Sequence, residues 1–414
     1  MNYLEDYLKS LYIFLTNNDG TNTNIIRKHT KNLVKSGDLS FPLIASNWKV
    51  LIHEKSENLK CIYEYLDRNE TDFIKLNENN KLKLQNGIKI NDNYHLFFNK
   101  SHCYQNCLSE INGNERFGSF QLEPTKFILK SESTQLSDIS GLRIKLIMRT
   151  TQNLINFCNG IVYNDEHNLN NECFMITFSL NSSNNHNLCL CGVVLNEKGL
   201  RDRVTTAEEY IENHIIRMRL ISEHKYGLRI TSKSGWREFF EKLGHASATL
   251  ELLQNKISST LTLNIKDPTI SSNKGSAFIL YNSARLSKLL KDFDDKVISN
   301  IYPPLPEVTE IDFSLLIEPE EWELFYVYIL QFPDCIKNCF KHLNNYKIQP
   351  HFLIQHLSGF CTVFSCYYRR VKILMDPRQH LFPALFAKIY LVKTLKMVMD
   401  IGLKLLNIEP IKQM

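Results

Sequence analysis

Hydrophobic positions recur every three or four residues through the last third of the chain, which is the spacing of one face of an α-helix. This pattern predicts helices over residues 276–291, 319–330, 335–343, 350–374 and 382–406. The proline-rich stretch IYPPLPEVTEIDF separates the first two helices and is expected to be an extended connector. The C-terminal third is therefore predicted to be all helical.

The pattern in the front half is mixed. Residues 1–19 predict a short amphipathic helix whose apolar face consists of Tyr3, Leu4, Tyr7, Leu8, Leu11, Ile13 and Phe14. The stretch IIRKHTKNLVKSGDLSFP then places four cations at helix-like spacing, Arg27, Lys28, Lys31 and Lys35. Between residues 50 and 190, the apolar runs LRIKLIMR, NGIVY and CFMITFSL are typical of strands between Asn- and Ser-rich loops. A mixed α/β region is expected here.

The chain becomes helical again at Thr206, which is followed by Glu208 and Glu209, an N-cap signature. The run GWREFFEKLGHASATLELLQ predicts one or two further helices. These patterns divide the chain into four parts: an N-terminal helical and basic segment (1–50), a mixed α/β region (51–205), connecting helices (206–274) and a helical domain (275–414).

Two of the predicted helices separate polar from apolar residues. On the 276–291 helix, Ile279, Leu286 and Leu290 share one face, and Tyr281, Arg285 and Lys288 share the opposite one. Arg285 is therefore expected to be exposed beside Tyr281. The last helix places Lys388, Lys393, Lys396, Asp400 and Lys404 on about half of its circumference.

The segment SGFCTVFSCYYRRVKILMDP (358–377) groups aromatic and basic side chains, which suits either a nucleic acid or a helix end in water. On the 350–374 helix, Tyr367 falls within the apolar band and is expected in the core. Arg369 falls opposite the band and should face solvent. Tyr368 and Arg370 lie on the flanks, where both interpretations stay open.

Charge is unevenly distributed, although the formal net charge of the chain is only +5. Residues 292–334 contain 11 acidic residues and one basic residue, whereas residues 335–414 contain 12 Lys or Arg and three acidic residues. A basic helical module after an acidic connector suggests a phosphate-rich partner. The alternative, that basic helices merely solvate a surface, stays open.

Composition and motifs exclude several classes. We expect no signal peptide and no apolar run of membrane-spanning length. The 11 cysteines suggest free thiols in a reducing compartment, and we therefore expect a cytoplasmic protein. The chain has no G-x-x-x-x-G-K-[ST], G-x-G-x-x-G, G-x-S-x-G or H-E-x-x-H motif. We expect no catalytic residues, no cofactor and no metal site.

Two stretches carry a family resemblance. GSAFILYNSARLSKLL (275–290) resembles the helix that opens the anticodon-binding domain of arginyl-tRNA synthetases, with Tyr281, Ala284 and Arg285 on the pattern. MVMDIGLKLLNIEPIKQM (397–414) is similar to their chain end, with matches at Gly402, Leu403, Leu405, Leu406, Pro410 and Met414. This is the DALR-type helical domain.

The chain resembles even more the family named DALR anticodon-binding domain-containing protein 3. GSAFILYNSARLSKLL, YPPLPEVTEIDFSLL (302–316) and YYRRVKILMDPRQHLF (367–382) look like that family's versions of these segments. More weakly, residues 188–219 resemble the degenerate end of a synthetase core. The implied fold class is α+β: a mixed α/β N-terminal part with a degenerate synthetase-like core, then an all-helical DALR-type bundle.

Departures from the synthetase pattern concern ATP binding. The chain lacks the H-x-G-H tetrapeptide, and GHAS (244–247) is its nearest fragment. KGLRDRVTT stands where a K-M-S-K-S-like loop is expected, and the letters D-A-L-R are absent. The recognition half therefore looks retained and the activation half lost.

The resemblance implies a non-catalytic protein that binds arginine tRNA. Its implied role is that of an adaptor for the methyltransferase that makes 3-methylcytidine in tRNA. The candidate tRNA-binding residues are Tyr281, Asn282, Arg285, Lys288, Tyr368, Arg369, Arg370, Lys372, Lys388 and Lys396. Two alternatives stay open: an arginyl-tRNA synthetase-like ligase with degenerate ATP motifs, and an interaction scaffold that does not bind RNA.

Overall fold

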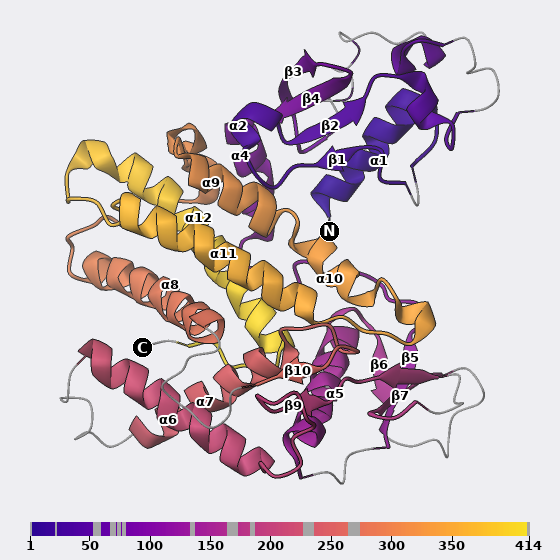
Figure 1. The fold of residues 1–414 in the computed structure, drawn as a ribbon. Helices are drawn as coiled ribbons and strands as arrows, with labels where there is room; N and C mark the ends of the chain where they lie inside the picture. Colours follow the sequence, from indigo (N-terminus) through magenta and orange to yellow (C-terminus); the bar gives the residue numbers. More distant parts are fainter. Residues whose placement is uncertain are drawn as a thin grey trace. The chain divides into compact units, whose positions relative to one another are not determined.

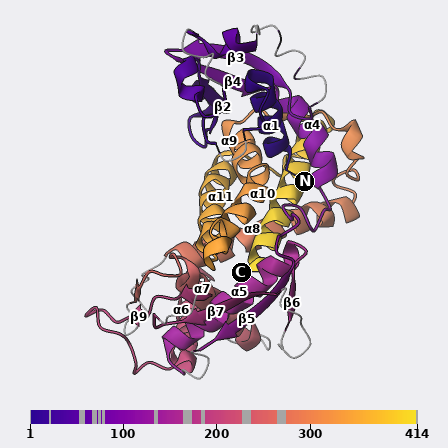
Figure 2. The same ribbon diagram turned by 90° about the vertical axis from the view of Figure 1, so that its right-hand side faces the viewer.

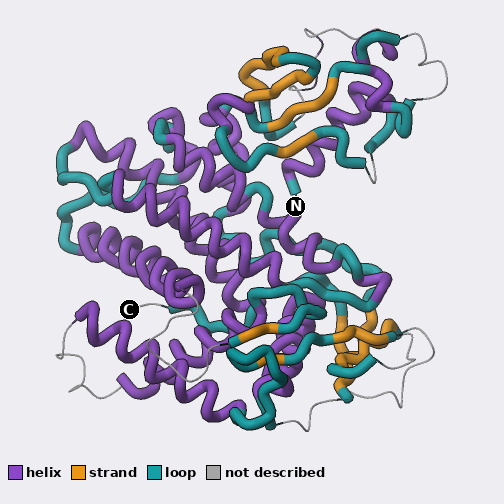
Figure 3. Tube along the Cα trace, in the orientation of Figure 1, coloured by secondary structure: helices purple, strands orange, loops and turns teal. Residues whose placement is uncertain are grey.

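The structure is a computed structural model that describes residues 2–20, 23–52, 59–66, 72, 76, 80–132, 137–163, 173–182, 187–226, 236–263 and 274–411. The chain divides into two compact units. Unit 1 comprises residues 1–114, 293–331 and 366–395, and unit 2 comprises residues 115–292, 332–365 and 396–414. Within the described residues, strands occur only before residue 263, and the C-terminal third is helical, as predicted (Figure 3).

Unit 1 begins with a helix and an antiparallel sheet in the strand order β1-β2-β4-β3 (Figure 1). Its N-terminal elements are α1 (Tyr3–Thr16), β1 (Arg27–Lys28), α2 (Leu33–Ser36), β2 (Leu39–Pro42), β3 (Leu84–Ile90), β4 (Asn93–Phe98) and α4 (Lys100–Ile111). After a connector with two short 3₁₀ turns come α9 (Pro319–Glu323) and the π-helical turn η8 (Leu324–Ile329). The connector confirms the extended segment expected from its prolines.

Asp38 ties α9 to the N-terminal sheet within unit 1. Its carboxylate accepts hydrogen bonds from the Trp322 indole N–H and the Phe98 backbone N–H, both at 2.7 Å. The Tyr326 hydroxyl donates to the Asp38 backbone carbonyl at 2.6 Å. Burial raises the pKa of Asp38 to about 6, because the charged form is poorly solvated there.

Unit 2 contains a fully parallel sheet in the order β6-β5-β7-β8, with α5 connecting β5 to β6 (Figure 2). Its first elements are β5 (Lys126–Ser131), α5 (Ile139–Phe157), β6 (Ile161–Tyr163), β7 (Phe174–Ser179), β8 (Leu188–Leu190) and β9 (Val194–Leu195). Next come α6 (Ala207–Tyr226), α7 (Trp236–Leu253) and β10 (Leu261–Thr262), which pairs with β9. The NGIVY and CFMITFSL strands are thus confirmed.

LRIKLIMR, however, lies inside α5, so its prediction as a strand was wrong. The helix begins after Asp138, whose side chain accepts a hydrogen bond from the Gly141 N–H at 2.8 Å. Arg143 is buried on α5 and donates to the carbonyls of Leu252, Gly192, Ser259 and Lys256. Arg143 thereby gives hydrogen-bond partners to the backbone carbonyls of the buried residues Leu252 and Gly192.

Thr206 is the N-cap, as expected, and forms a capping box with Glu209. The Thr206 hydroxyl accepts from the Glu209 N–H at 3.1 Å, and the Glu209 carboxylate accepts from the Thr206 N–H at 2.9 Å. α6 and α7 pack closely at Gly244, where a Cβ atom would lie 2.3 Å from Ile215 Cγ1. GHAS is therefore part of the α6–α7 helix packing, with Ser247 buried and His245 exposed.

The remaining helices are α8 (Lys274–Ile298), α10 (Phe332–Phe340), α11 (His351–Arg370) and α12 (Phe382–Leu405). Each was predicted, with boundaries within a few residues except at the end of α8. In α12, every residue from Leu385 to Val392 is buried, including Lys388, so the first half of the helix has no polar side. The predicted polar half of this helix is wrong there.

Two N-terminal expectations also need correction. In α1, Tyr12 is buried and Ile13 is 48% exposed, the reverse of the predicted face. Arg27 and Lys28 lie on β1, while Lys35 lies on the four-residue α2, so these cations do not share one helix. Met414, the last of the chain-end matches, lies outside the described residues. No helix in the described part of the chain is long and apolar enough to cross a membrane.

Candidate nucleic-acid interface

Tyr281 and Arg285 form a stacked pair on α8, within unit 2. They are one helical turn apart, and the guanidinium carbon of Arg285 lies 4.3 Å from the centroid of the Tyr281 ring. Arg285 Nη2 also donates to the Tyr281 hydroxyl at 2.6 Å. A cation held over a ring face is attracted by the ring's quadrupole, so this contact orients the guanidinium plane.

Two neighbouring side chains fix the other edge of the guanidinium. Arg285 Nη1 donates to Asn282 Oδ1 at 3.4 Å and to the Ser365 hydroxyl of α11 at 3.5 Å. These contacts explain why Arg285 is half-buried, whereas the helical pattern predicted an exposed side chain. The arginine does lie beside Tyr281, as expected.

Asn282 and Lys288 have different environments from this pair. Asn282 is fully buried, and its amide donates to the Phe278 carbonyl at 2.8 Å, so it positions Arg285 and has no exposed surface. Lys288 is exposed and pairs with Asp292 at 2.6 Å. On the apolar side, Ile279 and Leu286 are buried as predicted.

The C-terminal end of α11, in unit 1, presents the two tyrosines and two arginines. Tyr367 is fully buried and donates to the Glu321 carboxylate at 2.7 Å, which confirms its prediction as a core residue. Burial raises the pKa of Glu321, and the hydrogen bond from Tyr367 partly offsets this shift. Tyr368 is 41% exposed and Arg369 is exposed, as the helical pattern indicated for Arg369.

Arg370 is held by two carboxylates from the start of α9. Its Nε donates to Glu320 Oε1 at 2.9 Å, and its Nη2 contacts both Glu320 Oε2 and Glu318 Oε2. These bonds raise the pKa of Arg370 and lower the pKa of Glu320. Glu318 and Glu320 were not among the residues predicted from the sequence, because pairing with a residue 50 positions away leaves no local pattern.

The three remaining candidates are lysines. Lys372 is exposed and pairs with Asp376 at 2.6 Å, and Lys396 is mostly covered and pairs with Asp400. Lys388 is only 7% exposed, and its charge lowers the pKa of Glu321 against the effect of burial. Lys388 therefore does not belong to an exposed surface.

Comparison with known proteins points to one family. Residues 279–414 match the family described as the DALR anticodon binding domain. A protein from Danio rerio named DALR anticodon-binding domain-containing protein 3 is 30% identical over 217 residues, which are 50% of this chain and 39% of that protein. One of the same name from Rattus norvegicus is 29% identical over 226 residues, which are 54% of this chain and 42% of that protein. The chain spans about two fifths of the length of these curated relatives.

Solved structures extend the likeness to the whole fold. Arginyl-tRNA synthetase from Thermus thermophilus aligns with a TM-score of 0.64 at 9% identity and covers 99% of each chain. The Plasmodium falciparum enzyme aligns with a TM-score of 0.66 at 10% identity and covers 100% of each chain. At such identity the alignment establishes the fold alone. The chain thus has the fold of arginyl-tRNA synthetases, carries a DALR anticodon binding domain at residues 279–414, and is similar over half its length to the proteins named DALR anticodon-binding domain-containing protein 3.

Proposed function

We propose that this chain binds tRNA through its DALR anticodon binding domain without charging it. The observation that carries the proposal is the Tyr281–Arg285 stack, which lies within the residues that match this domain. A half-buried, oriented guanidinium beside an aromatic ring suits both a phosphate and the face of an unstacked base. Arg369 and Tyr368, both exposed, add a second cation and ring at the end of α11.

The preferred RNA is an arginine tRNA, and the proposed role is that of a cytoplasmic adaptor. The fold that the chain shares with arginyl-tRNA synthetases, together with the match of residues 279–414 to an anticodon binding domain, supports arginine tRNA as the preferred RNA. The sequence lacks the H-x-G-H tetrapeptide, which supports a role without aminoacylation. The adaptor presents the tRNA to the methyltransferase that makes 3-methylcytidine.

Equilibrium binding of purified chain to arginine tRNA and to a non-arginine tRNA, across a salt series, tests the proposal. We expect tighter binding of the arginine tRNA, with an affinity that falls steeply as salt rises. Arg285→Ala should weaken binding, whereas Arg237→Ala, which removes a cation that is 94% exposed on α7, serves as the matched control. No binding at low salt contradicts the proposal and favours a scaffold that does not bind RNA.

Two further assays address the adaptor role. A pull-down from cells should recover arginine tRNA together with the methyltransferase, and Arg285→Ala should reduce recovery of the RNA. Arginine-dependent exchange of pyrophosphate into ATP should be absent. Exchange activity above that of a heat-inactivated sample contradicts the non-catalytic role and identifies a ligase.

A further inference from the structure

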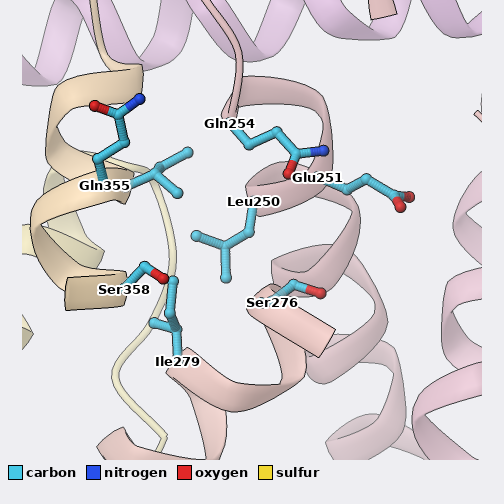
Figure 4. A pocket seen from close by; sticks show the side chains of 9 residues that line it. Leu250, Glu251, Gln254, Ser276, Ile279, Gln355 and Ser358 are labelled. Carbon is cyan, nitrogen blue, oxygen red and sulfur yellow. The ribbon is translucent and has the colours of Figure 1, made fainter. Parts of the chain in front are cut away.

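Two features of the molecule take no part in the proposed RNA contacts. The first is a cavity of about 300 Å³ in unit 2, between α7, α8 and α11, whose lining includes Gln254 and Gln355. Figure 4 shows that the Gln254 amide and the Glu251 carboxylate, both on the α7 side, point away from Gln355. The Glu251 carboxylate accepts a hydrogen bond from the Tyr210 hydroxyl at 2.7 Å and lies 2.8 Å from His214 Nε2. Glu251 therefore holds α6 on α7.

The second feature lies in unit 1 and is the acidic segment, residues 294–317. This segment contains five acidic residues and one basic residue, Lys296. The Lys296 ammonium lies 4.8 Å from the centroid of the Tyr302 ring and donates to the Tyr302 hydroxyl at 3.2 Å. All five acidic residues are exposed, and none of them forms an ion pair with a residue that the structure describes. The outward charge of the segment is therefore negative and uncompensated within the described residues.

The backbone of the acidic segment is anchored by groups from other parts of unit 1. The Tyr390 hydroxyl of α12 donates to the Pro306 carbonyl at 2.6 Å, and the Gln105 amide of α4 donates to the Val308 carbonyl at 3.2 Å. Phe313, near the far end of the segment, is buried. Because the backbone is already ordered, a partner that contacts the outward side chains does not have to order the chain first.

Exposed isoleucines lie at both ends of the acidic segment. Ile298 and Ile301, where α8 ends, are 79% and 47% exposed, and Ile317 is 79% exposed. Asp294 and Asp295 precede Ile298 by about one helical turn, so two carboxylates and an apolar side chain share one side of α8. Single exposed apolar side chains are common, whereas apolar side chains surrounded by polar groups are typical of interaction sites.

The chemistry of this surface distinguishes between two classes of partner. RNA carries a negative charge at every phosphate and is repelled by the exposed carboxylates. Isoleucine side chains also provide no planar group on which a base can stack. A protein surface that presents Lys or Arg around apolar side chains complements both the charge and the isoleucines. The acidic segment therefore fits a basic protein partner.

We infer that the acidic segment docks a basic, partly apolar surface of the methyltransferase. The inference rests on the proposed function, which supplies a partner enzyme that acts on RNA. Such an enzyme exposes Lys and Arg to bind phosphates, and the part of that basic surface that extends beyond the RNA contacts the carboxylates of the segment. The basic residues of this chain thus hold the RNA, and the acidic segment holds the enzyme.

Binding of the purified methyltransferase to the full chain, without RNA and across a salt series, tests the inference. The charge variant combines Asp294→Asn, Asp295→Asn, Glu307→Gln and Glu310→Gln, and the apolar variant combines Ile298→Ser and Ile301→Ser. The charge variant should bind the methyltransferase about tenfold more weakly at low salt, with a difference that shrinks as salt rises. The apolar variant should bind about fivefold more weakly at every salt concentration.

Two matched controls change exposed residues outside the acidic segment. Glu208→Gln with Glu212→Gln removes two exposed carboxylates of α6, and Val50→Ser removes an apolar side chain that is 82% exposed. Both controls should bind the methyltransferase like wild type. The charge and apolar variants should bind arginine tRNA at least as tightly as wild type, which also shows that they are folded.

The two possible failures are distinguishable. The inference is overturned if either the charge variant or the apolar variant binds the methyltransferase like wild type, or if its affinity for arginine tRNA falls by the same factor. The second result would mean that the acidic segment supports RNA binding. If wild type does not bind the methyltransferase even at low salt, the proposed adaptor role itself fails.

Discussion

Two candidate RNA-binding arginines, one in each unit, differ in the hydrogen-bond partners that hold them. Arg285 is half-buried, stacked on Tyr281, and donates to the neutral oxygens of Tyr281, Asn282 and Ser365. Arg370 is exposed, yet it is held by the carboxylates of Glu318 and Glu320. The less exposed arginine is thus the one that is oriented by uncharged groups, and the more exposed one is paired with two negative charges.

This difference shows that exposure and readiness to bind a phosphate are separate properties. A phosphate that approaches Arg370 must compete with Glu318 and Glu320. At Arg285 the same approach leaves the ring stack in place, because the stack uses the face of the guanidinium. We therefore expect the two arginines to contribute unequally to RNA affinity.

The largest predicted effect concerns Asp38, which positions the helix that carries Glu320. Asp38→Ala leaves the Trp322 and Phe98 N–H groups buried without an acceptor, and we expect a loss of about 3 kcal/mol in the free energy of unfolding. Chemical denaturation measures it. An unchanged midpoint and slope contradicts the role of Asp38 in anchoring α9.

Asp38 also predicts a dependence on pH. Its pKa is about 6 in the folded protein against an ordinary 3.8, so between these values the folded state binds more protons than the unfolded chain. This carboxyl therefore makes stability fall as the pH rises from 4 to 6, and two pKa units correspond to about 3 kcal/mol. Asp38→Asn should remove this component. The control Asp376→Asn removes an exposed carboxylate whose pKa Lys372 lowers, and should leave the component intact.

Next in size is the loss of RNA affinity on removing the stacked arginine. Arg285→Ala should weaken binding of arginine tRNA about tenfold, because both a cation and a stacking plane are lost. Arg285→Lys should keep only part of the wild-type RNA affinity, since an ammonium group retains the charge but cannot stack as a plane on the Tyr281 ring. Equilibrium binding at fixed salt measures both. If Arg285→Ala binds RNA like wild type, the Tyr281–Arg285 pair is structural, and Arg285 does not contribute more to RNA affinity than Arg370.

The third prediction releases Arg370 from its carboxylates. The Glu318→Gln, Glu320→Gln double variant should tighten RNA binding about threefold and steepen the salt dependence by about one counterion. Arg370→Ala alone should change affinity less than Arg285→Ala does. A loss of affinity in the double variant means that these glutamates support binding, which is the reverse of the expected sign.

The smallest predicted effect concerns two exposed lysines, Lys288 near Arg285 and Lys372 near Arg370. Lys288 and Lys372 each pair with an aspartate four residues away, Asp292 and Asp376. Such exposed pairs contribute little, so Lys288→Ala and Lys372→Ala should each change RNA affinity less than about twofold at physiological salt. A larger loss of RNA affinity from one of these variants identifies that lysine as a direct phosphate contact.

Much of the helical part could be predicted, because its signals are local. The apolar spacing placed α9 to α12, the Thr206 capping box started α6, and the prolines marked the connector. LRIKLIMR was misread because its first five residues alternate between apolar and basic side chains, a pattern that also fits a half-buried strand. The difference lay in Asp138, the cap that precedes it.

The candidate interface was predictable residue by residue only where a helix face decides the outcome. Tyr367 in the core and Arg369 in solvent followed from angles around α11. The burial of Lys388 and the carboxylates at Arg370 did not, because both depend on segments distant in sequence. The cavity between α7, α8 and α11 gave no sequence signal for the same reason.

The sequence by itself determined the helices of the C-terminal third, the cap at Thr206 and which helix carries a tyrosine one turn before an arginine. These outcomes depend on contacts within four residues, which are the contacts that a sequence pattern records. Only the tertiary structure decided that Arg285 meets Ser365, that Glu318 and Glu320 hold Arg370, and that two glutamines line one cavity. The physical reason is that charge pairing and cavity shape arise between distant segments, whose packing fixes which groups meet.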